Sequence, residues 1–229
     1  MWIFTAGNTT RHATQYRVNR VFVAGDAAHV HVPAGGQGVN VGMQDAVNLA
    51  WKLAAEAKGR VTPLITHGAA SYDRERRPVA RLLSCNTQAQ TALMTAFTPE
   101  GAALRDLMST LLGRPETNER LANLLSGLSV SYDNPDAAHP LDGHRAPDLR
   151  LSDGETLLRR LRIDRFLLLD FTPSEEFAAL GSPAVQVASA EPWSGPAAAL
   201  IRPDGYIARA WTVADVDQAR AALTDWVSA

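Results

Sequence analysis

The sequence predicts an α/β fold in two parts, and three features of the chain support this prediction. A short apolar run at residues 21–24 is followed by a glycine-rich loop and a long helical pattern. Further helical patterns occupy most of residues 64–128. Residues 156–227 then alternate between short helical and strand patterns. We therefore expect one part dominated by helices and a second part built on a small mixed sheet.

Length and composition set limits on the class of protein. The chain has 229 residues, 46% of them hydrophobic, which is enough for one or two domains that bury on the order of 70% of their unfolded surface. A formal net charge of −2 without a dense basic block predicts neither a nucleic acid nor an anionic membrane as partner. The single cysteine, Cys85, excludes an intrachain disulfide and a cysteine-clustered metal site. We expect a cytoplasmic protein, because no signal peptide or membrane span is recognisable.

The first elements lead to one site. Residues 2–4 are predicted to end a strand, and residues 21–24 predict a short buried strand that stops at Asp26. After Gly38, apolar residues recur at three- and four-residue spacing, which predicts a helix that Gly59 closes as its C′ residue. The stripe comprises Val39, Met43, Ala46, Val47, Ala50, Leu53 and Ala54. A strand end and a helix start are thus expected to face each other.

This arrangement has chemical consequences. The first amides of the helix, at residues 38–40, have no intrahelical partner, and the helix dipole favours an electron-rich atom there. Gly35 and Gly36 lack a Cβ atom, so the backbone can adopt unusual dihedrals and a flat ligand can approach closely. Asp26 could accept hydrogen bonds from hydroxyl groups. The chemistry alone favours neither a bound polar cofactor nor a plain structural turn.

Three segments together carry a resemblance to a known family. They are Gly-Asp-Ala-Ala-His at residues 25–29, the proline- and glycine-rich residues 33–40, and residues 44–53 of the helix. They resemble the second flavin motif of class A flavoprotein monooxygenases, which have the para-hydroxybenzoate hydroxylase fold, and are most similar to bacterial aromatic polyketide hydroxylases. The resemblance implies the C-terminal part of an FAD-binding monooxygenase domain. It also implies FAD as cofactor, NAD(P)H as reductant and an aromatic small molecule as substrate.

The resemblance also assigns roles to individual residues. Asp26 is implied to bind the ribityl chain of FAD, and Pro33 to line the flavin beside the substrate. The amides at residues 38–40 are implied to meet the N1 and C2 carbonyl edge of the isoalloxazine, where a helix N-terminus stabilises the negative charge of reduced flavin. The implied cofactor-binding residues are Gly25, Asp26, Pro33, Gly35, Gly36, Gly38, Val39 and Asn40. No catalytic side chain and no metal ligand is nominated.

The helices that follow are predicted from their apolar periodicity. Residues 64–76 predict a second helix that Pro78 kinks or restarts, and the charges of residues 71–79 are expected on an exposed face. Residues 79–97 predict a further helix with Cys85 as a packed thiol. Helices are also predicted at 100–112 and 115–128, with leucine stripes that would drive self-association if left uncovered. His29 and His31 are expected to point to opposite faces of an extended segment, which makes them poor joint metal ligands.

A change of composition marks the second domain. Turn-forming residues fill 131–147, so we assign a partial FAD-binding domain to 1–130, a linker to 131–147 and a second domain to 148–229. Its predicted elements are a helical turn at 156–161, a strand at 165–170, a helix at 173–180, a strand at 185–188, a hairpin at 198–211 and a helix at 215–227. This order is that of a thioredoxin-like α/β domain. Without a Cys-x-x-Cys motif, dithiol exchange is excluded.

The resemblance extends into this domain but has one large departure. Residues 145–148 and 200–206 resemble the C-terminal domain of the same hydroxylases. However, the G-x-G-x-x-G unit that cradles the FAD pyrophosphate in that family does not occur in the sequence. We expect the C-terminal portion of an aromatic hydroxylase that needs an N-terminal half. The alternatives are a non-enzymatic remnant that acts as scaffold or partner subunit, and one half of a split flavoenzyme.

Overall fold

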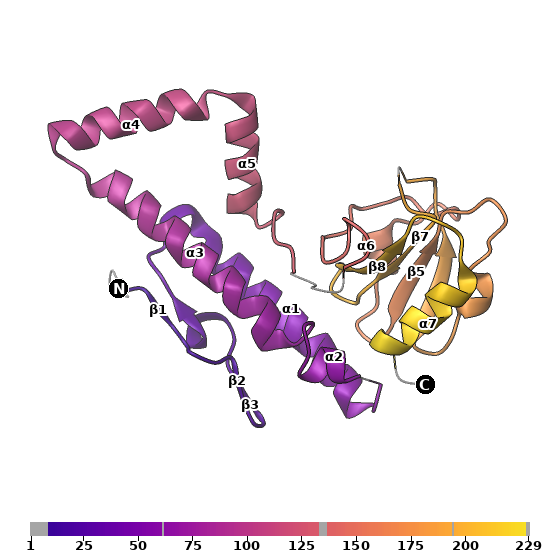
Figure 1. The fold of residues 1–229 in the computed structure, drawn as a ribbon. Helices are drawn as coiled ribbons and strands as arrows, with labels where there is room; N and C mark the ends of the chain where they lie inside the picture. The colour runs from indigo at the N-terminus through magenta and orange to yellow at the C-terminus, as the bar shows by residue number, and fades with distance from the viewer. Residues whose placement is uncertain (1–8, 61, 133–136, 194, 228–229) are drawn as a thin grey trace. The chain divides into compact units, whose positions relative to one another are not determined.

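The computed structural model describes residues 9–60, 62–132, 137–193 and 195–227. The chain divides into two compact units (Figure 1). We call residues 1–46 with 76–130 the helical unit, and residues 47–75 with 131–229 the sheet unit. The strand predicted at residues 2–4 lies outside the described residues.

Two small antiparallel ribbons open the helical unit. Strand β1 (Arg11–His12) pairs with β4 (His29–Val30), and β2 (Arg17–Val18) pairs with β3 (Val21–Phe22). The predicted strand at 21–24 is therefore present but short, and the prediction that it is buried is wrong. Val21 is 67% exposed, because its ribbon is a two-residue hairpin that turns at Asn19, whose φ is 55°, and packs nothing over this side chain.

The long helix α1 (Gln37–Ala57) begins and ends as predicted. It follows the short 3-10 turn η2 (Ala34–Gly36). Gly59 closes it with a φ of 67°, and the amide of Arg60 donates to the carbonyl of Ala55 at 2.9 Å.

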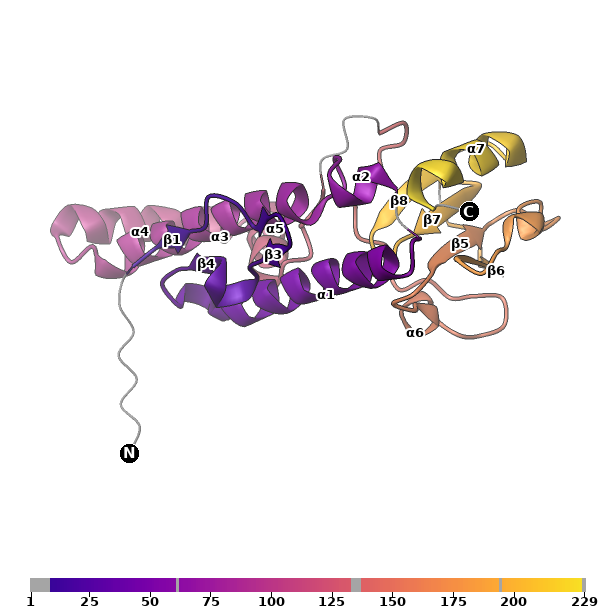
Figure 2. The same cartoon turned by 90° about the horizontal axis from the view of Figure 1, so that it is seen from below.

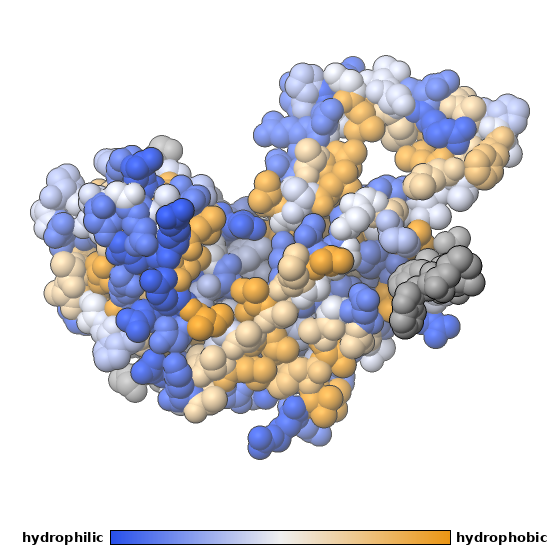
Figure 3. Space-filling model, turned by 180° about the vertical axis from the view of Figure 1, so that it is seen from behind, coloured by the Kyte–Doolittle hydropathy of each residue, from blue (hydrophilic) through white to orange (hydrophobic). Residues whose placement is uncertain are grey.

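The apolar stripe predicted on α1 faces solvent. Val39 is 73% exposed and Met43 is 55% exposed. Figure 3 shows that hydrophobic residues, in orange, gather in patches on the surface. The buried residues of α1 are Gln37, Val41, Asp45, Asn48, Trp51 and Lys52. A mostly polar face is therefore turned inward, and it is stabilised largely by hydrogen bonds and ion pairs, with Trp51 packed in a hydrophobic cluster.

The predicted helix at 64–76 is two helices. The short α2 (Pro63–Thr66) ends where the amide of Gly68 donates to the carbonyl of Pro63, at 2.8 Å. A side chain at Gly68 would have its Cβ only 2.7 Å from Leu64 Cα, so the chain turns there and helix α3 (Tyr72–Thr95) starts afresh.

Helix α3 also corrects three smaller expectations. It runs through Pro78 without ending there. Cys85 is exposed on it, so the prediction of a packed thiol is wrong. The charges at its start were expected on an exposed face, yet Glu75 and Arg76 are buried, because both form internal ion pairs.

Two further helices complete the helical unit as predicted. Helix α4 (Pro99–Leu112) is capped by Thr98, whose hydroxyl accepts a hydrogen bond from the amide of Gly101 at 3.2 Å. Helix α5 (Pro115–Ser126) starts with proline and ends at Gly127, which has a φ of 74°. The leucine stripe of α4 is partly uncovered, with Leu107 55% exposed.

The sheet unit has the strand order of a thioredoxin-like domain. Its four-stranded sheet has the order β6 (Val185–Ser189), β5 (Phe166–Asp170), β7 (Ala198–Ile201) and β8 (Ile207–Trp211). Strand β5 is parallel to β6 and antiparallel to β7, which forms a hairpin with β8. The short α6 (Leu157–Arg160) precedes the sheet and α7 (Val216–Trp226) follows it.

One element of this domain was predicted wrongly. The helix expected at 173–180 is reduced to the 3-10 turn η3 (Ala178–Leu180). The reason is the buried carboxylate of Asp170, which accepts hydrogen bonds from the amides of Thr172 at 2.9 Å and Phe177 at 2.8 Å. These bonds hold the segment as a turn instead of a helix.

Two hydrophobic clusters lie on the two faces of the sheet. Phe166 and Leu168 point to the face where α7, Trp51 and Trp226 pack. Figure 2 shows α7 on one side of the sheet. Leu167 and Leu169 point to the other face, where Leu151 and Leu157 pack. This alternation is the period-two pattern of a strand buried on both sides.

Candidate cofactor site

The turn that carries Asp26 packs directly on α1. The 3-10 turn η1 (Gly25–Ala27) starts at Gly25, which has a φ of 56°. A Cβ atom built on Gly42 would lie 3.4 Å from Gly25 Cα, so no side chain separates turn and helix. Asp26 itself is exposed, and among the described residues its carboxylate has no hydrogen bond or ion pair. A free carboxylate is thus held beside the first turns of α1.

A buried carboxylate on α1 fixes this turn. Asp45 is fully buried and accepts three donors: the Gly25 amide at 3.1 Å, His29 Nε2 at 2.8 Å and Arg76 Nε at 2.7 Å. Burial alone would raise the pKa of Asp45, but the hydrogen bond from His29 and the charge of Arg76 hold the pKa below its usual value. The carboxylate is therefore ionised, and it ties together the turn, strand β4 and helix α3.

The glycine loop leaves space on one side. Gly35 and Gly36 have φ values of 69° and 65°, a left-handed conformation that glycine adopts without strain. A Cβ atom on Gly36 would meet nothing within 4 Å, whereas one on Gly35 would lie 3.1 Å from Gln37 Nε2. Pro33 before the loop is exposed. One side of the loop is therefore open to a ligand and the other side is packed.

The start of α1 continues this open surface. Gly38, Val39 and Asn40 form its first turn, and Val39 and Asn40 are exposed. A Cβ atom on Gly38 would lie 3.0 Å from His31 Nε2, so glycine is needed for the loop to pass the imidazole. The amides at this helix start are suited to bind an electron-rich ligand atom.

The two histidines lie closer than the sequence suggested. The rings of His29 and His31 are stacked, with centroids 6.2 Å apart, so the expectation that they point to opposite faces is wrong. Residues two apart on an extended segment point to the same face, so the expectation was at odds with strand geometry. In the described part of the chain, no group of three or more potential metal ligands is found.

The structure thus brings the predicted residues into two neighbouring segments but does not test their roles. Gly25 and Asp26 are held on α1 through Gly42 and Asp45, and the loop from Pro33 continues directly into Gly38, Val39 and Asn40. The sequence prediction missed Asp45, His29 and Arg76. A signal was available, because polar residues recur along α1 with helical spacing at positions 37, 44, 45, 48 and 52.

The sheet unit contains a second buried ionic cluster. Glu75 accepts a bidentate pair of hydrogen bonds from Arg202, at 2.5 and 2.9 Å, and one from Lys52 Nζ at 2.6 Å. Asp204 pairs with Arg202 at 2.6 Å and accepts a hydrogen bond from Trp51 Nε1 at 2.9 Å. The side chains of all four charged residues are at most 6% exposed.

Aromatic rings flank the charges of this cluster, and burial and the neighbouring charges shift the pKa values of Lys52 and Glu75. The Arg202 guanidinium lies 5.2 Å from the Trp51 ring centroid and 5.0 Å from that of Tyr132. Burial lowers the pKa of Lys52 to about 8 despite the opposing charge of Glu75. Burial alone would raise the pKa of Glu75, but the charges of Arg202 and Lys52 lower it to about 2. This cluster is remote in sequence from the predicted cofactor residues.

Comparison with known proteins relates two segments of the chain to known families. Residues 1–87 match the family described as FAD binding domain, and residues 139–229 match aromatic-ring hydroxylase, C-terminal. Most of the chain therefore consists of part of an FAD binding domain and the C-terminal domain of an aromatic-ring hydroxylase. Within the described residues, no helix is long and apolar enough to cross a membrane.

Individual relatives agree with this assignment. A 12-dehydrotetracycline 5-monooxygenase/anhydrotetracycline 6-monooxygenase of Streptomyces rimosus is 43% identical over 93% of this chain and 44% of its own length. A rifampicin monooxygenase of Streptomyces venezuelae is 39% identical over 100% of this chain and 46% of its own length. The chain therefore spans less than half the length of these curated relatives.

Solved structures support the fold. The OxyS anhydrotetracycline hydroxylase from Streptomyces rimosus has a TM-score of 0.83 at 41% identity, over 96% of this chain and 47% of that chain. CabE, an aromatic hydroxylase from angucycline biosynthesis, has a TM-score of 0.83 at 37% identity, over 100% of this chain and 49% of that chain. The predicted fold class is confirmed: part of an FAD-binding monooxygenase domain followed by a thioredoxin-like domain.

Proposed function

We propose that this chain supplies the flavin-loop half of an FAD- and NAD(P)H-dependent monooxygenase that hydroxylates an aromatic polyketide-type substrate. The relatives named above act on tetracycline and rifampicin compounds, which supports this substrate class. Bound FAD, reduced by NAD(P)H, would supply the oxygen chemistry. The residues of this chain hold and orient the cofactor.

The observation that carries the proposal is the Asp45 anchor. The Asp45 carboxylate accepts a hydrogen bond from the Gly25 amide at 3.1 Å and thereby fixes the turn. The neighbouring Asp26 carboxylate is therefore held at the surface, and its own oxygens form no hydrogen bond among the described residues. A carboxylate with free acceptor sites on a rigid turn fits the hydroxyls of a ribityl chain. Gly36, with open space where a side chain would be, fits the approach of a flat ring.

Each predicted cofactor residue then has a role in binding. Asp26 accepts hydrogen bonds from the ribityl hydroxyls, and Gly25 allows the turn to lie against α1. Pro33 borders the ring beside the substrate. The loop glycines and the amides of Gly38, Val39 and Asn40 approach its N1 and C2 carbonyl edge. The helix dipole stabilises negative charge at that edge.

A direct test is the visible absorption spectrum of the purified chain after incubation with FAD and removal of the excess. Retained flavin bands support the proposal. For the Asp26→Ala variant we expect flavin binding to weaken by roughly 1.5 to 3 kcal/mol, as for loss of a charged hydrogen bond. Asp106→Ala, at an exposed aspartate on α4, is the matched control and should bind as the wild type does. An unchanged dissociation constant for Asp26→Ala contradicts the assigned role.

A second candidate function is a scaffold or partner subunit without cofactor. It is favoured by the exposed apolar stripe of α1 and by Leu107 on α4. It predicts a folded chain that retains no flavin and elutes as an oligomer in size-exclusion chromatography with light scattering. Recovery of flavin binding on adding a separately expressed G-x-G-x-x-G domain would instead identify a split flavoenzyme.

A further inference from the structure

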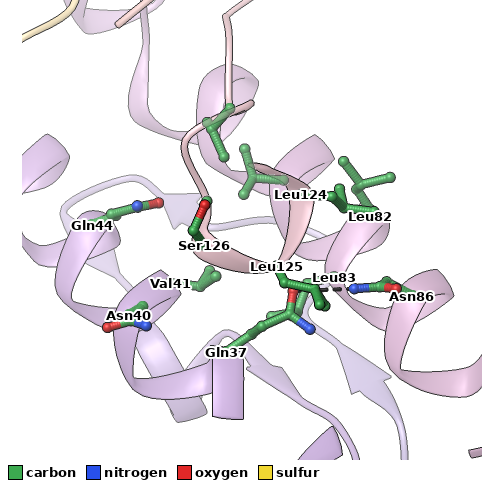
Figure 4. A pocket seen from close by; sticks show the side chains of 13 residues that line it. Gln37, Asn40, Val41, Gln44, Leu82, Leu83, Asn86, Leu124, Leu125 and Ser126 are labelled. Atoms are coloured by element: carbon green, nitrogen blue, oxygen red, sulfur yellow. Dashed lines mark hydrogen bonds between the residues drawn. The ribbon is translucent and has the colours of Figure 1, made fainter. Parts of the chain in front are cut away.

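The packed side of the glycine loop rests on carboxamide side chains. Gln37, the first residue of α1, is only 5% exposed, and its Oε1 accepts a hydrogen bond from Asn86 Nδ2 on α3 at 3.2 Å. Figure 4 shows this bond in the cavity formed by α1, α3 and the end of α5. The loop is therefore joined to α3 at the point where it becomes helix.

A second carboxamide of α3 reaches the loop one helical turn further on. Gln90 lies close to Gly35: a Cβ atom on this glycine would be 3.1 Å from Gln90 Oε1 and 3.1 Å from Gln37 Nε2. One side of the exposed Gly35 thus lies against the two glutamine side chains. Asn86 and Gln90 are four residues apart, so both project from the same face of α3.

The two glutamines also retain unused donors. Gln37 Nε2 and Gln90 Nε2 are buried, and neither has a hydrogen-bond partner. Leaving a buried polar group unpaired is unfavourable, so each of these two donors calls for a structural or functional explanation. By contrast, the opposite side of the loop at Gly36 is open.

We propose that Asn86 and Gln90 are positioning residues that hold the glycine loop, through Gln37 and Gly35, in the left-handed conformation that receives the cofactor ring. The part of this inference that concerns flavin rests on the proposed function. We call the contacts of Asn86 and Gln90 with Gln37 and Gly35 the clamp. The clamp does not depend on the proposed function, because it is a property of the loop in the chain without ligand. Loss of the Asn86 donor leaves Gln37 Oε1 buried and unpaired and frees the loop to sample other conformations.

The first experiment measures amide hydrogen exchange of residues 34–40 in the full chain without ligand. In Asn86→Leu we expect exchange of this segment to rise about tenfold, with exchange elsewhere on α1 unchanged. Asn86→Asp should retain protection, because the carboxylate can accept the unused Nε2 donor of Gln37 after that amide rotates. Gln88→Leu, at an exposed glutamine on the same helix, is the matched control and should behave as wild type.

The second experiment measures the FAD dissociation constant and the absorption spectrum of the bound flavin. Asn86→Leu and Gln90→Leu should each weaken binding about five- to tenfold and shift the flavin bands, while Asn86→Asp and Gln88→Leu should not. If wild type binds no flavin, either alone or with a separately expressed G-x-G-x-x-G domain, the proposed function fails, but the exchange experiment still decides whether Asn86 and Gln90 hold the loop. Unchanged exchange of the loop in Asn86→Leu overturns the clamp, whatever the flavin result.

Discussion

Helix α1 uses its buried polar face differently in the two units. In the helical unit one carboxylate, Asp45, binds a backbone amide, a histidine and an arginine next to the predicted cofactor loop. In the sheet unit Lys52 belongs to a cluster of two cations and two carboxylates that is flanked by aromatic rings. The first arrangement fixes a turn that presents a free carboxylate. The second joins secondary structure elements through paired, buried side chains.

This difference suggests separate roles for the two clusters. The Asp45 cluster is expected to influence both flavin binding and stability, whereas the Glu75 and Arg202 cluster is expected to influence stability alone. Buried ion pairs contribute little net stability compared with apolar packing, but removal of one partner leaves an uncompensated buried charge. Single substitutions should therefore have large effects in both clusters.

The largest effect is expected for Arg202→Met. This change leaves Glu75 and Asp204 with Lys52 as their sole cationic partner in the cluster, and we expect a loss of about 3 to 5 kcal/mol in the free energy of unfolding. Urea denaturation measures it, with Arg159→Met at an exposed position of α6 as control. The flavin affinity of the folded fraction should be unchanged. A loss of affinity as large as that of Asp26→Ala would contradict the separation of roles.

Asp45→Asn should affect both properties. The amide keeps the size of the side chain but leaves Arg76 buried without its carboxylate, so we expect a loss of about 3 kcal/mol in stability. It also weakens the bond that holds the Gly25 amide. Flavin titration of the folded variant should therefore show weaker binding together with lower stability, and a stable variant with normal affinity would refute the anchor role.

The pH dependence of stability tests the sheet unit cluster. The pKa of Glu75 is lowered from 4.5 to about 2 in the folded state, so the unfolded state binds more protons between these values. Glu75 therefore stabilises the fold above pH 4.5, and this contribution, about 3 kcal/mol, is lost as the pH falls towards 2. Urea denaturation across this range should show a shallower acid slope for Glu75→Gln than for wild type. Equal slopes would show that Glu75 is not held ionised by the cluster.

The sequence was most informative where local signals and tertiary structure agree. Gly59 and Gly127 end their helices with positive φ, and the Pro-Asp-Gly turn joins β7 to β8. The glycine loop and the Asp26 turn were predicted from a family motif, and both turns are present, at Ala34–Gly36 and Gly25–Ala27.

Three errors of the sequence analysis share a physical cause: distant polar partners that local patterns do not encode. Asp170 folds residues 172–177 into a turn by binding their amides, against a helical pattern. Glu75 appeared to belong to an exposed charged face, yet its partner Arg202 is 127 residues away. Asp45 was overlooked for the same reason, since hydrophobic periodicity assigns polar residues to the solvent side.

The smallest expected change in the free energy of unfolding is for a substitution in the exposed stripe of α1, and it contrasts with the large change expected on the buried face of the same helix. Met43 is 55% exposed, so Met43→Lys removes little packing and should change the free energy of unfolding by less than about 0.5 kcal/mol. Asp45→Asn, two residues away, should cost several times more. Urea denaturation of both variants makes the comparison. A large loss for Met43→Lys would show that this face is covered in solution, and light scattering would then reveal whether a second copy covers it.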